Sequence, residues 1–128
     1  MTLDSSALIA ILFAEPGHLD LIDKILGADH VRIGTPTLVE TSMVYVGRRR
    51  TDAVGDVVAL LEELDVTITP FGEPEWHAAT AAFLRFGRRR HAAALNFGDC
   101  LAYASAAVAG DSLLFVGDDL ALTDVVPA

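Results

Sequence analysis

Cysteine and lysine are nearly missing from this 128-residue sequence, which contains one of each, Cys100 and Lys24. A single cysteine excludes a disulfide framework and favours a reducing compartment. A phospho-acceptor signalling domain needs a lysine near its last strand, and Lys24 lies too early in the chain to serve. No apolar run reaches the length of a membrane span, and the start lacks the basic segment of a secretory signal. We therefore expect a cytoplasmic protein with no membrane partner.

Two sequence patterns are also missing after the first predicted strand, which ends at Asp4. No glycine-rich loop follows that strand, which argues against a phosphate-cradling nucleotide-binding domain. A hydrolase of the haloacid dehalogenase type has a second aspartate two residues after the first, and here that position is Ser6. Both classes are therefore disfavoured.

Basic residues are few and unevenly distributed. The formal net charge is −9, which argues against a general nucleic-acid binder. Seven of the nine basic residues nevertheless lie between Arg48 and Arg90, as Arg85 and the two runs 48–50 and 88–90. Such runs are often solvated charges at helix ends, but arginine is also suited to bidentate contact with phosphate. Both interpretations remain open from the sequence.

The hydrophobic pattern predicts one α/β domain over residues 1–128, because predicted strands alternate with predicted helices. Short apolar runs predict strands at 1–4, 31–35, 66–71 and 112–116, and an edge strand at 123–126. Helical spacing predicts helices at 7–14, 18–28, 35–50, 53–64, 72–86 and 96–110. We expect Ser5 or Ser6 to cap the first helix, and Thr35 to cap the third with Pro36 in its first turn. This alternation predicts a parallel sheet of four or five strands, covered by helices on both faces.

The last of these helices has the clearest boundaries. Asn96 followed by Asp99 resembles a capping pair, and Gly110 is a favourable terminator. No charged residue follows Asp99 within the segment, so we expect this helix to be buried on both faces. The apolar content of the whole chain, 52%, also predicts an exposed apolar patch, and hence a partner or a second copy.

Acidic residues from separate elements are predicted to meet at one edge of the sheet, where strands end and helices begin. They are Asp4, Glu40, Asp99, and Asp118 or Asp119. Carboxylates gathered in this way repel one another, and a hard divalent cation such as Mg²⁺ or Mn²⁺ would neutralise them. The alternative is a set of unrelated caps and surface turns, in which Asp99 only complements the helix dipole.

The residues at these positions resemble the PIN-domain family. Asp4-Ser5-Ser6-Ala7-Leu8 is similar to its opening motif, and Glu40 lies where the family has its second acid. The segment from Asn96 to Ala104, Asn-Phe-Gly-Asp-Cys-Leu-Ala-Tyr-Ala, resembles the motif of the third acid. The segment from Leu113 to Leu120, Leu-Leu-Phe-Val-Gly-Asp-Asp-Leu, resembles the final motif. The VapC toxins of bacterial type II toxin–antitoxin modules are the most similar branch.

This resemblance implies a three-layer α/β/α sandwich and a Mg²⁺- or Mn²⁺-dependent endoribonuclease that cleaves RNA with a metal-activated water. Asp4 and Asp99 would be the main metal ligands, and Glu40 and a fourth acid would complete the site. Many relatives have that acid where this chain has Gly117, so the role moves to Asp118, with Asp119 as the alternative. Ser6 would orient Asp4 or contact RNA.

The resemblance also implies partners: a VapB-type antitoxin, a second copy of the chain, and an RNA substrate of the tRNA or rRNA kind. We expect Arg88 and Arg89 to bind the phosphates of that RNA, because their segment leads into the helix of Asp99. A catalytically silent PIN-like domain that only binds a protein partner is the alternative function.

Overall fold

Four parallel strands form the central sheet of the computed structural model, which describes all 128 residues. The strands are β1 (Thr2–Leu3), β2 (Val31–Gly34), β3 (Val66–Thr69) and β4 (Leu113–Leu114), in the order β3-β2-β1-β4. All three pairings are parallel, so every strand ends at the same edge of the sheet. This confirms the parallel α/β fold and settles the number of strands at four.

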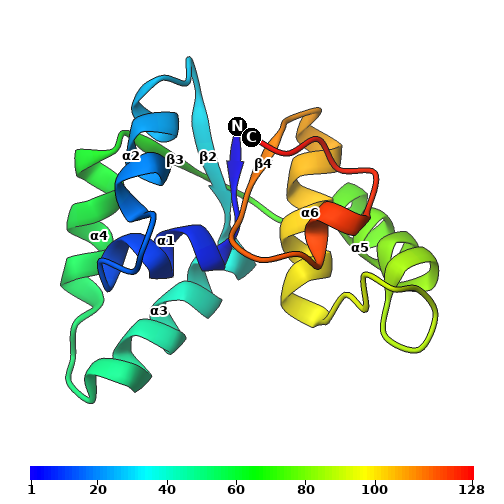
Figure 1. Cartoon of the computed structure of the whole chain (residues 1–128), viewed down its shortest axis with the longest axis horizontal. Coiled ribbons are helices and arrows are strands. Elements are labelled where there is room, and N and C mark those ends of the chain that lie inside the picture. Colours follow the sequence, from blue (N-terminus) through cyan, green and yellow to red (C-terminus); the bar gives the residue numbers. More distant parts are fainter.

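The chain forms six α-helices, and Figure 1 shows how they are arranged around the sheet. The helices α1, α2 and α4 lie on one side of the sheet, and α5 and α6 lie on the other. The helix α3 starts directly at the end of β2 and contacts both α1 and α6. None of these helices is long and apolar enough to span a membrane. Their bounds are α1 (Ser5–Leu12), α2 (His18–Leu26), α3 (Thr35–Arg49), α4 (Val54–Glu63), α5 (Glu73–Phe86) and α6 (Phe97–Ala109).

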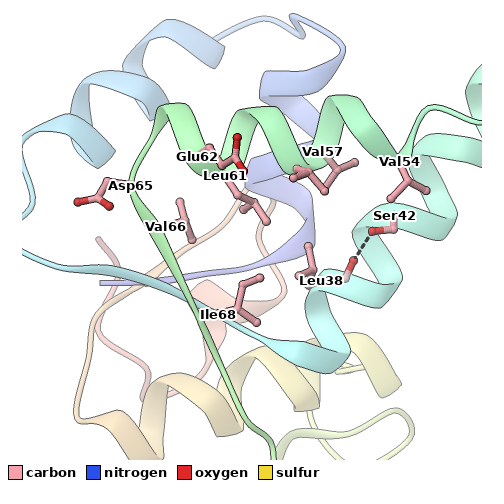
Figure 2. Close-up of a pocket in the computed structure, with 10 residues that line it drawn as sticks. Leu38, Ser42, Val54, Val57, Leu61, Glu62, Asp65, Val66 and Ile68 are labelled. Atoms are coloured by element: carbon pink, nitrogen blue, oxygen red, sulfur yellow. Dashed lines mark hydrogen bonds between the residues drawn. The ribbon is translucent and has the colours of Figure 1, made fainter.

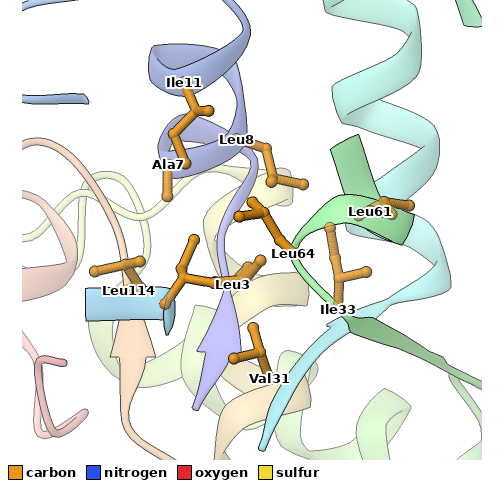
Figure 3. Close-up of a cluster of buried hydrophobic side chains, with 10 residues drawn as sticks. Leu3, Ala7, Leu8, Ile11, Val31, Ile33, Leu61, Leu64 and Leu114 are labelled. Carbon is orange, nitrogen blue, oxygen red and sulfur yellow. The ribbon is translucent and has the colours of Figure 1, made fainter. Parts of the chain in front are cut away.

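The hydrophobic core is divided by the sheet into two parts. Figure 3 shows the part under α1 and α4, where Leu3 and Ile33 of the strands meet Leu8 and Leu61 of the helices. The other part lies under α5 and α6 and contains Leu113, the neighbour of Leu114 in β4. Successive strand residues point to opposite faces, so the continuously apolar strands supply both parts of the core.

The helix α6 begins and ends as its sequence predicts. Asn96 is the N-cap, and Gly110 ends the helix with a left-handed φ of 67°. The expected burial on both faces was wrong: Gly98, Cys100, Ala102, Ala104 and Ala106 are buried, but Phe97 is exposed, Leu101 and Tyr103 are half-buried, and residues 107–109 of the last turn are exposed.

Three other local predictions were wrong. The N-cap of α1 is Asp4, whose side chain accepts a hydrogen bond from the Ser6 amide, and the N-cap of α3 is Gly34 instead of Thr35. No strand forms at 123–126, where the chain makes only one parallel bridge, between Leu113 and Pro127. A short 3₁₀ helix, η1 (Leu120–Leu122), occupies the residues before it and leaves too little extended chain for a fifth strand.

Candidate active site

Acidic residues from four parts of the chain lie at the edge of the sheet where the strands end. Asp4 follows β1, and Asp118 and Asp119 follow β4. Glu40 lies in the second turn of α3, and Asp99 lies in the first turn of α6. In a parallel α/β fold strand ends and helix starts share one edge, which explains why residues so distant in sequence come to one region.

Asp4 is held in place by the loop that follows β4. Its side chain is buried, with 4% of its surface exposed. Oδ2 accepts hydrogen bonds from the Ser6 amide at 3.0 Å and from the Ser6 hydroxyl. The Ser6 hydroxyl in turn accepts a hydrogen bond from the Val116 amide at 2.9 Å. Ser6 therefore orients Asp4, and the hydrogen bonds that Asp4 accepts all go to one of its two oxygens.

Asp99 is positioned by the capping box of α6. The Asn96 amide donates to Asp99 Oδ2 at 2.8 Å, and the Asp99 amide donates to Asn96 Oδ1 at 3.0 Å. This reciprocal arrangement satisfies two of the free amides at the start of the helix. It also fixes the carboxylate through one oxygen, as in Asp4.

Glu40 lies directly against the start of α6. A Cβ atom at Gly98 would lie 2.6 Å from Glu40 Oε1 and 2.7 Å from Oε2, so position 98 tolerates no side chain while Glu40 is in place. Oε2 of Glu40 is buried and has no hydrogen-bond partner. A buried carboxylate oxygen without a partner is costly for a protein to keep. The Glu40 carboxylate therefore has one buried oxygen that is not satisfied by the rest of the chain.

The acids raise one another's pKa. Burial raises the pKa of Glu40, and the charges of Asp4 and Asp99 raise it further, against the effect of a hydrogen bond from Ser5. Burial also raises the pKa of Asp99, with smaller contributions from Asp4 and Asp119, while the Asn96 amide and Arg88 lower it. Asp119, and not Asp118, is among the groups that act on Asp99.

The charges of these side chains affect one another, but the side chains do not converge on one position where they could all bind the same metal ion. No group of three or more His, Cys, Asp or Glu side chains is arranged closely enough to hold a metal ion as it stands. The donor set itself suits a hard cation, because it consists of carboxylates that include the unpartnered Glu40 Oε2.

Two of the arginines are already paired with carboxylates outside this site. Arg85 binds Asp124 through Nη1 and Oδ2, which lie 2.5 Å apart. Tyr103 donates its hydroxyl to Asp124 Oδ1 at 2.7 Å, and burial together with this bond raises the pKa of Tyr103 to about 12. Arg48 pairs with Glu15 at 3.3 Å and lies about 12 Å beyond Glu40 along α3. The run at 48–50 is therefore directed away from the acids.

Three apolar grooves mark the surface. Figure 2 shows the first, a groove of about 510 Å³ between α3, α4 and β3 that includes Leu38, Val57 and Ile68. A second, of about 700 Å³, runs between α3 and α6 and includes Glu40 itself, Met43 and Phe97. A third, of about 450 Å³, lies between α5 and α6 and shares Phe97 with the second. These grooves confirm that the chain exposes apolar surface beyond its core.

Comparison with known proteins identifies the family. The sequence profile of the PIN domain matches residues 1–126. Ribonuclease VapC36 of Mycobacterium tuberculosis is 36% identical over 126 residues, which cover 98% of this chain and 91% of that protein. Ribonuclease VapC of Mycolicibacterium smegmatis is 37% identical over 126 residues, which cover 98% and 97% of the two chains. The chain belongs to the VapC branch of the PIN-domain family.

Solved structures agree with this PIN fold. Mycobacterium tuberculosis VapC20, described as a sarcin-ricin loop cleaving toxin, superposes with a TM-score of 0.75 at 17% identity, over 99% of this chain and 97% of that one. A toxin–antitoxin complex from Klebsiella pneumoniae contains a chain that superposes with a TM-score of 0.73 at 14% identity, covering 99% and 95%. At these identities the likeness shows the fold alone.

Two features of the PIN site went unnoticed in the sequence. The first is Gly98, where the missing side chain makes room for the Glu40 carboxylate. A glycine next to an acid in the first turn of a helix was the available signal. The second is the bond from Val116 to Ser6, which joins residues 110 positions apart and has no local sequence signal.

Proposed function

We propose that this PIN domain is a metal-dependent endoribonuclease and acts as the toxin of a toxin–antitoxin system. The observation that carries the proposal is the group formed by Asp4, Glu40 and Asp99, whose charges act on one another while Glu40 Oε2 stays buried without a partner. Membership of the VapC branch gives the reaction class, hydrolysis of RNA.

Asp4 and Asp99 would be the main ligands of the metal, supported by Glu40 and a fourth acid. Their donors are carboxylate oxygens, which Mg²⁺ and Mn²⁺ prefer. When bound, such an ion supplies an activated water and stabilises the charge that develops on the phosphate. Gly98 keeps the space that the Glu40 carboxylate needs beside Asp99.

The protein's own groups prepare the site for this reaction. Ser6 and Asn96 each engage Oδ2 of one aspartate and fix its orientation. Oε2 of Glu40, which is buried and has no partner, would remain free to bind the metal.

The fourth acid is one of two neighbours, Asp118 and Asp119. Asp118 is the residue that the sequence favours, and Asp119 is the alternative. Of these two, Asp119 alone is among the charges that raise the pKa of Asp99, which favours Asp119 as the acid that faces the site.

A VapB-type antitoxin and a second copy of the chain are the proposed protein partners. The groove between α3 and α6 favours a protein contact, because Met43 and Phe97 on it are 71% and 81% exposed. A large exposed apolar surface of this kind usually marks an interaction site. The RNA substrate is proposed to be a loop of tRNA or rRNA, and the structural neighbour VapC20 is described as cleaving such a loop.

Cleavage of a panel of synthetic and structured RNAs by the purified chain tests the nuclease. We expect cleavage with Mg²⁺ or Mn²⁺, none with EDTA, and at least about a 100-fold loss in Asp99→Asn, because a metal ligand supports several kcal/mol of transition-state stabilisation. Asp65→Asn is the matched control, since Asp65 is exposed, precedes β3 at the opposite edge, and has a left-handed φ of 51° that asparagine tolerates.

A protein-binding domain without activity is the second candidate, favoured by the three apolar grooves and by the absence of a ready-made three-ligand centre. RNA that stays intact under every metal condition, with protein shown to be folded and free of antitoxin, would establish this candidate. Cleavage that Asp99→Asn leaves unchanged would show that another site or a contaminant is responsible.

A further inference from the structure

The arginines around the end of α5 differ in what they contact. Arg85 is bound to Asp124, and the Arg90 guanidinium lies 5.7 Å over the ring of Phe83. The side chains of Arg88 and Arg89 take part in none of the ion pairs of the chain. The donors of both therefore remain available for a ligand, and the backbone decides which of the two lies beside the acid site.

The backbone places Arg88 next to the start of α6. The Arg88 amide donates to the Leu95 carbonyl at 3.3 Å, and the Leu95 amide donates to the Phe86 carbonyl at 3.0 Å. Gly87 and Leu95 thereby form a parallel bridge. Leu95 directly precedes Asn96, which caps the helix and holds Asp99. Arg88 therefore lies next to the residue that precedes the N-cap of α6.

The loop between these two points is built to keep one shape. The amides of Arg90 and His91 both donate to the Gly87 carbonyl, at 3.1 and 3.2 Å. The His91 ring packs edge-on against Phe86 with centroids 5.2 Å apart. A Cβ at position 87 would lie 2.4 Å from the Phe83 carbonyl oxygen, so only glycine allows this close return of the chain. A loop held in this way loses little entropy when it binds a ligand.

The exposure of Arg88 supports the same placement. Its side chain is exposed and unpaired, while its backbone is bonded to the residue that precedes the N-cap of α6. The guanidinium is therefore free to bind an anion beside the start of that helix. Arginine presents a planar set of donors that matches the oxygens of a phosphate.

We propose that Arg88, whose backbone is bonded to Leu95 just before α6, holds a backbone phosphate of the RNA beside the acid site, and that Arg85 and Arg90 are structural. This inference rests on the proposed ribonuclease function. Within the basic run 88–90, it assigns the positioning of the substrate strand to Arg88.

Binding of a fluorescein-labelled single-stranded RNA in EDTA tests the assignment without cleavage. We expect Arg88→Ala to weaken binding about 10-fold or more, because a charge-assisted phosphate contact is lost. The slope of log K against log salt should fall by about 0.7, the value for one phosphate contact on a single strand. Arg88→Lys should keep the slope but recover only part of the affinity. Arg50→Ala, at an exposed residue beyond the far end of α3, is the control and should match the wild type.

A double-variant cycle separates phosphate binding from mere neutralisation of Asp99. If Arg88 contacts RNA, Arg88→Ala weakens binding by a similar factor in the wild type and in Asp99→Asn. If Arg88 only offsets the charge of Asp99, its effect disappears in Asp99→Asn, and the proposal is wrong. Thermal unfolding of each variant shows that a loss of binding is not a loss of fold.

Cleavage by the wild type in Mg²⁺ keeps this inference distinct from the proposed function. Cleavage and binding by Arg88→Ala at wild-type levels would overturn the role of Arg88 and leave the ribonuclease intact. A wild type that neither binds nor cleaves any RNA would overturn both.

Discussion

Acidic side chains at opposite edges of the same sheet have different partners. At the edge where the strands begin, Asp111 Oδ2 accepts a hydrogen bond from the Thr2 hydroxyl at 3.0 Å and lies 2.9 Å from Arg32 Nε. The Arg32 contact is an ion pair rather than a well-aligned hydrogen bond. At the edge where the strands end, Asp4, Glu40 and Asp99 have no cation paired with them.

The difference separates a carboxylate that is paired within the fold from carboxylates that have no cation partner. Asp111 joins three strands, through Thr2 of β1, Arg32 of β2 and its own position before β4. The pKa values of Glu40 and Asp99 are raised, because their burial and shared charge favour the protonated forms. A fold keeps such unpaired charge mainly where function requires it.

Added divalent metal should produce the largest difference between the two edges. If Mg²⁺ or Mn²⁺ binds the folded chain and not the unfolded chain, it raises the free energy of unfolding by about 2.7 kcal/mol at a concentration about 100 times the dissociation constant. Thermal unfolding with added metal and with EDTA measures the shift. Asp99→Asn should lose most of it, and Asp111→Asn should retain it. An equal response in both variants would mean that metal binds elsewhere.

Replacement of Asp111 should lower the stability of the fold and leave RNA cleavage unchanged. Asp111→Asn removes the charge that faces Arg32 and should lower the free energy of unfolding by about 1.5 kcal/mol. Cleavage of RNA per folded molecule should stay at the wild-type level, because Asp111 is at the opposite edge from the acids. Urea unfolding, together with the RNA assay, measures both quantities. A cleavage defect in a fully folded Asp111→Asn would break the distinction between the two edges.

The smallest effect is the pH dependence of stability in EDTA. Acids whose folded pKa is raised stabilise the fold below the unfolded pKa, here 3.8 for Asp99 and 4.5 for Glu40, and this contribution is lost as the pH rises through the folded values. In the double variant Glu40→Gln with Asp99→Asn, these two groups no longer titrate and cause no such loss of stability. We therefore expect the free energy of unfolding of the wild type to fall relative to that of the double variant as the pH rises from about 4 to about 7. A constant difference over this range, measured by chemical unfolding, would contradict the raised pKa values.

Local sequence signals predicted most of the elements. The capping pair Asn96 and Asp99 and the terminator Gly110 set both ends of α6, and the apolar periods located all six helices. The edge strand at 123–126 was predicted wrongly because the chain there follows the 3₁₀ helix η1 and meets β4 through a single bridge, between Leu113 and Pro127. Asp4 displaced the predicted serine caps because its carboxylate reaches the Ser6 amide.

The alternation of strands and helices already predicts that four acidic elements lie at one edge of the sheet, because strand ends and helix starts share an edge in any parallel α/β fold. The contacts of each side chain at that edge became visible with the folded structure. Arg85 is bound by Asp124 and Arg88 is not, Gly98 makes room for Glu40, and Ser6 connects Asp4 to Val116. The physical reason is that element positions follow from local periodicity and capping, whereas the pairing of charges depends on distances between residues far apart in the chain.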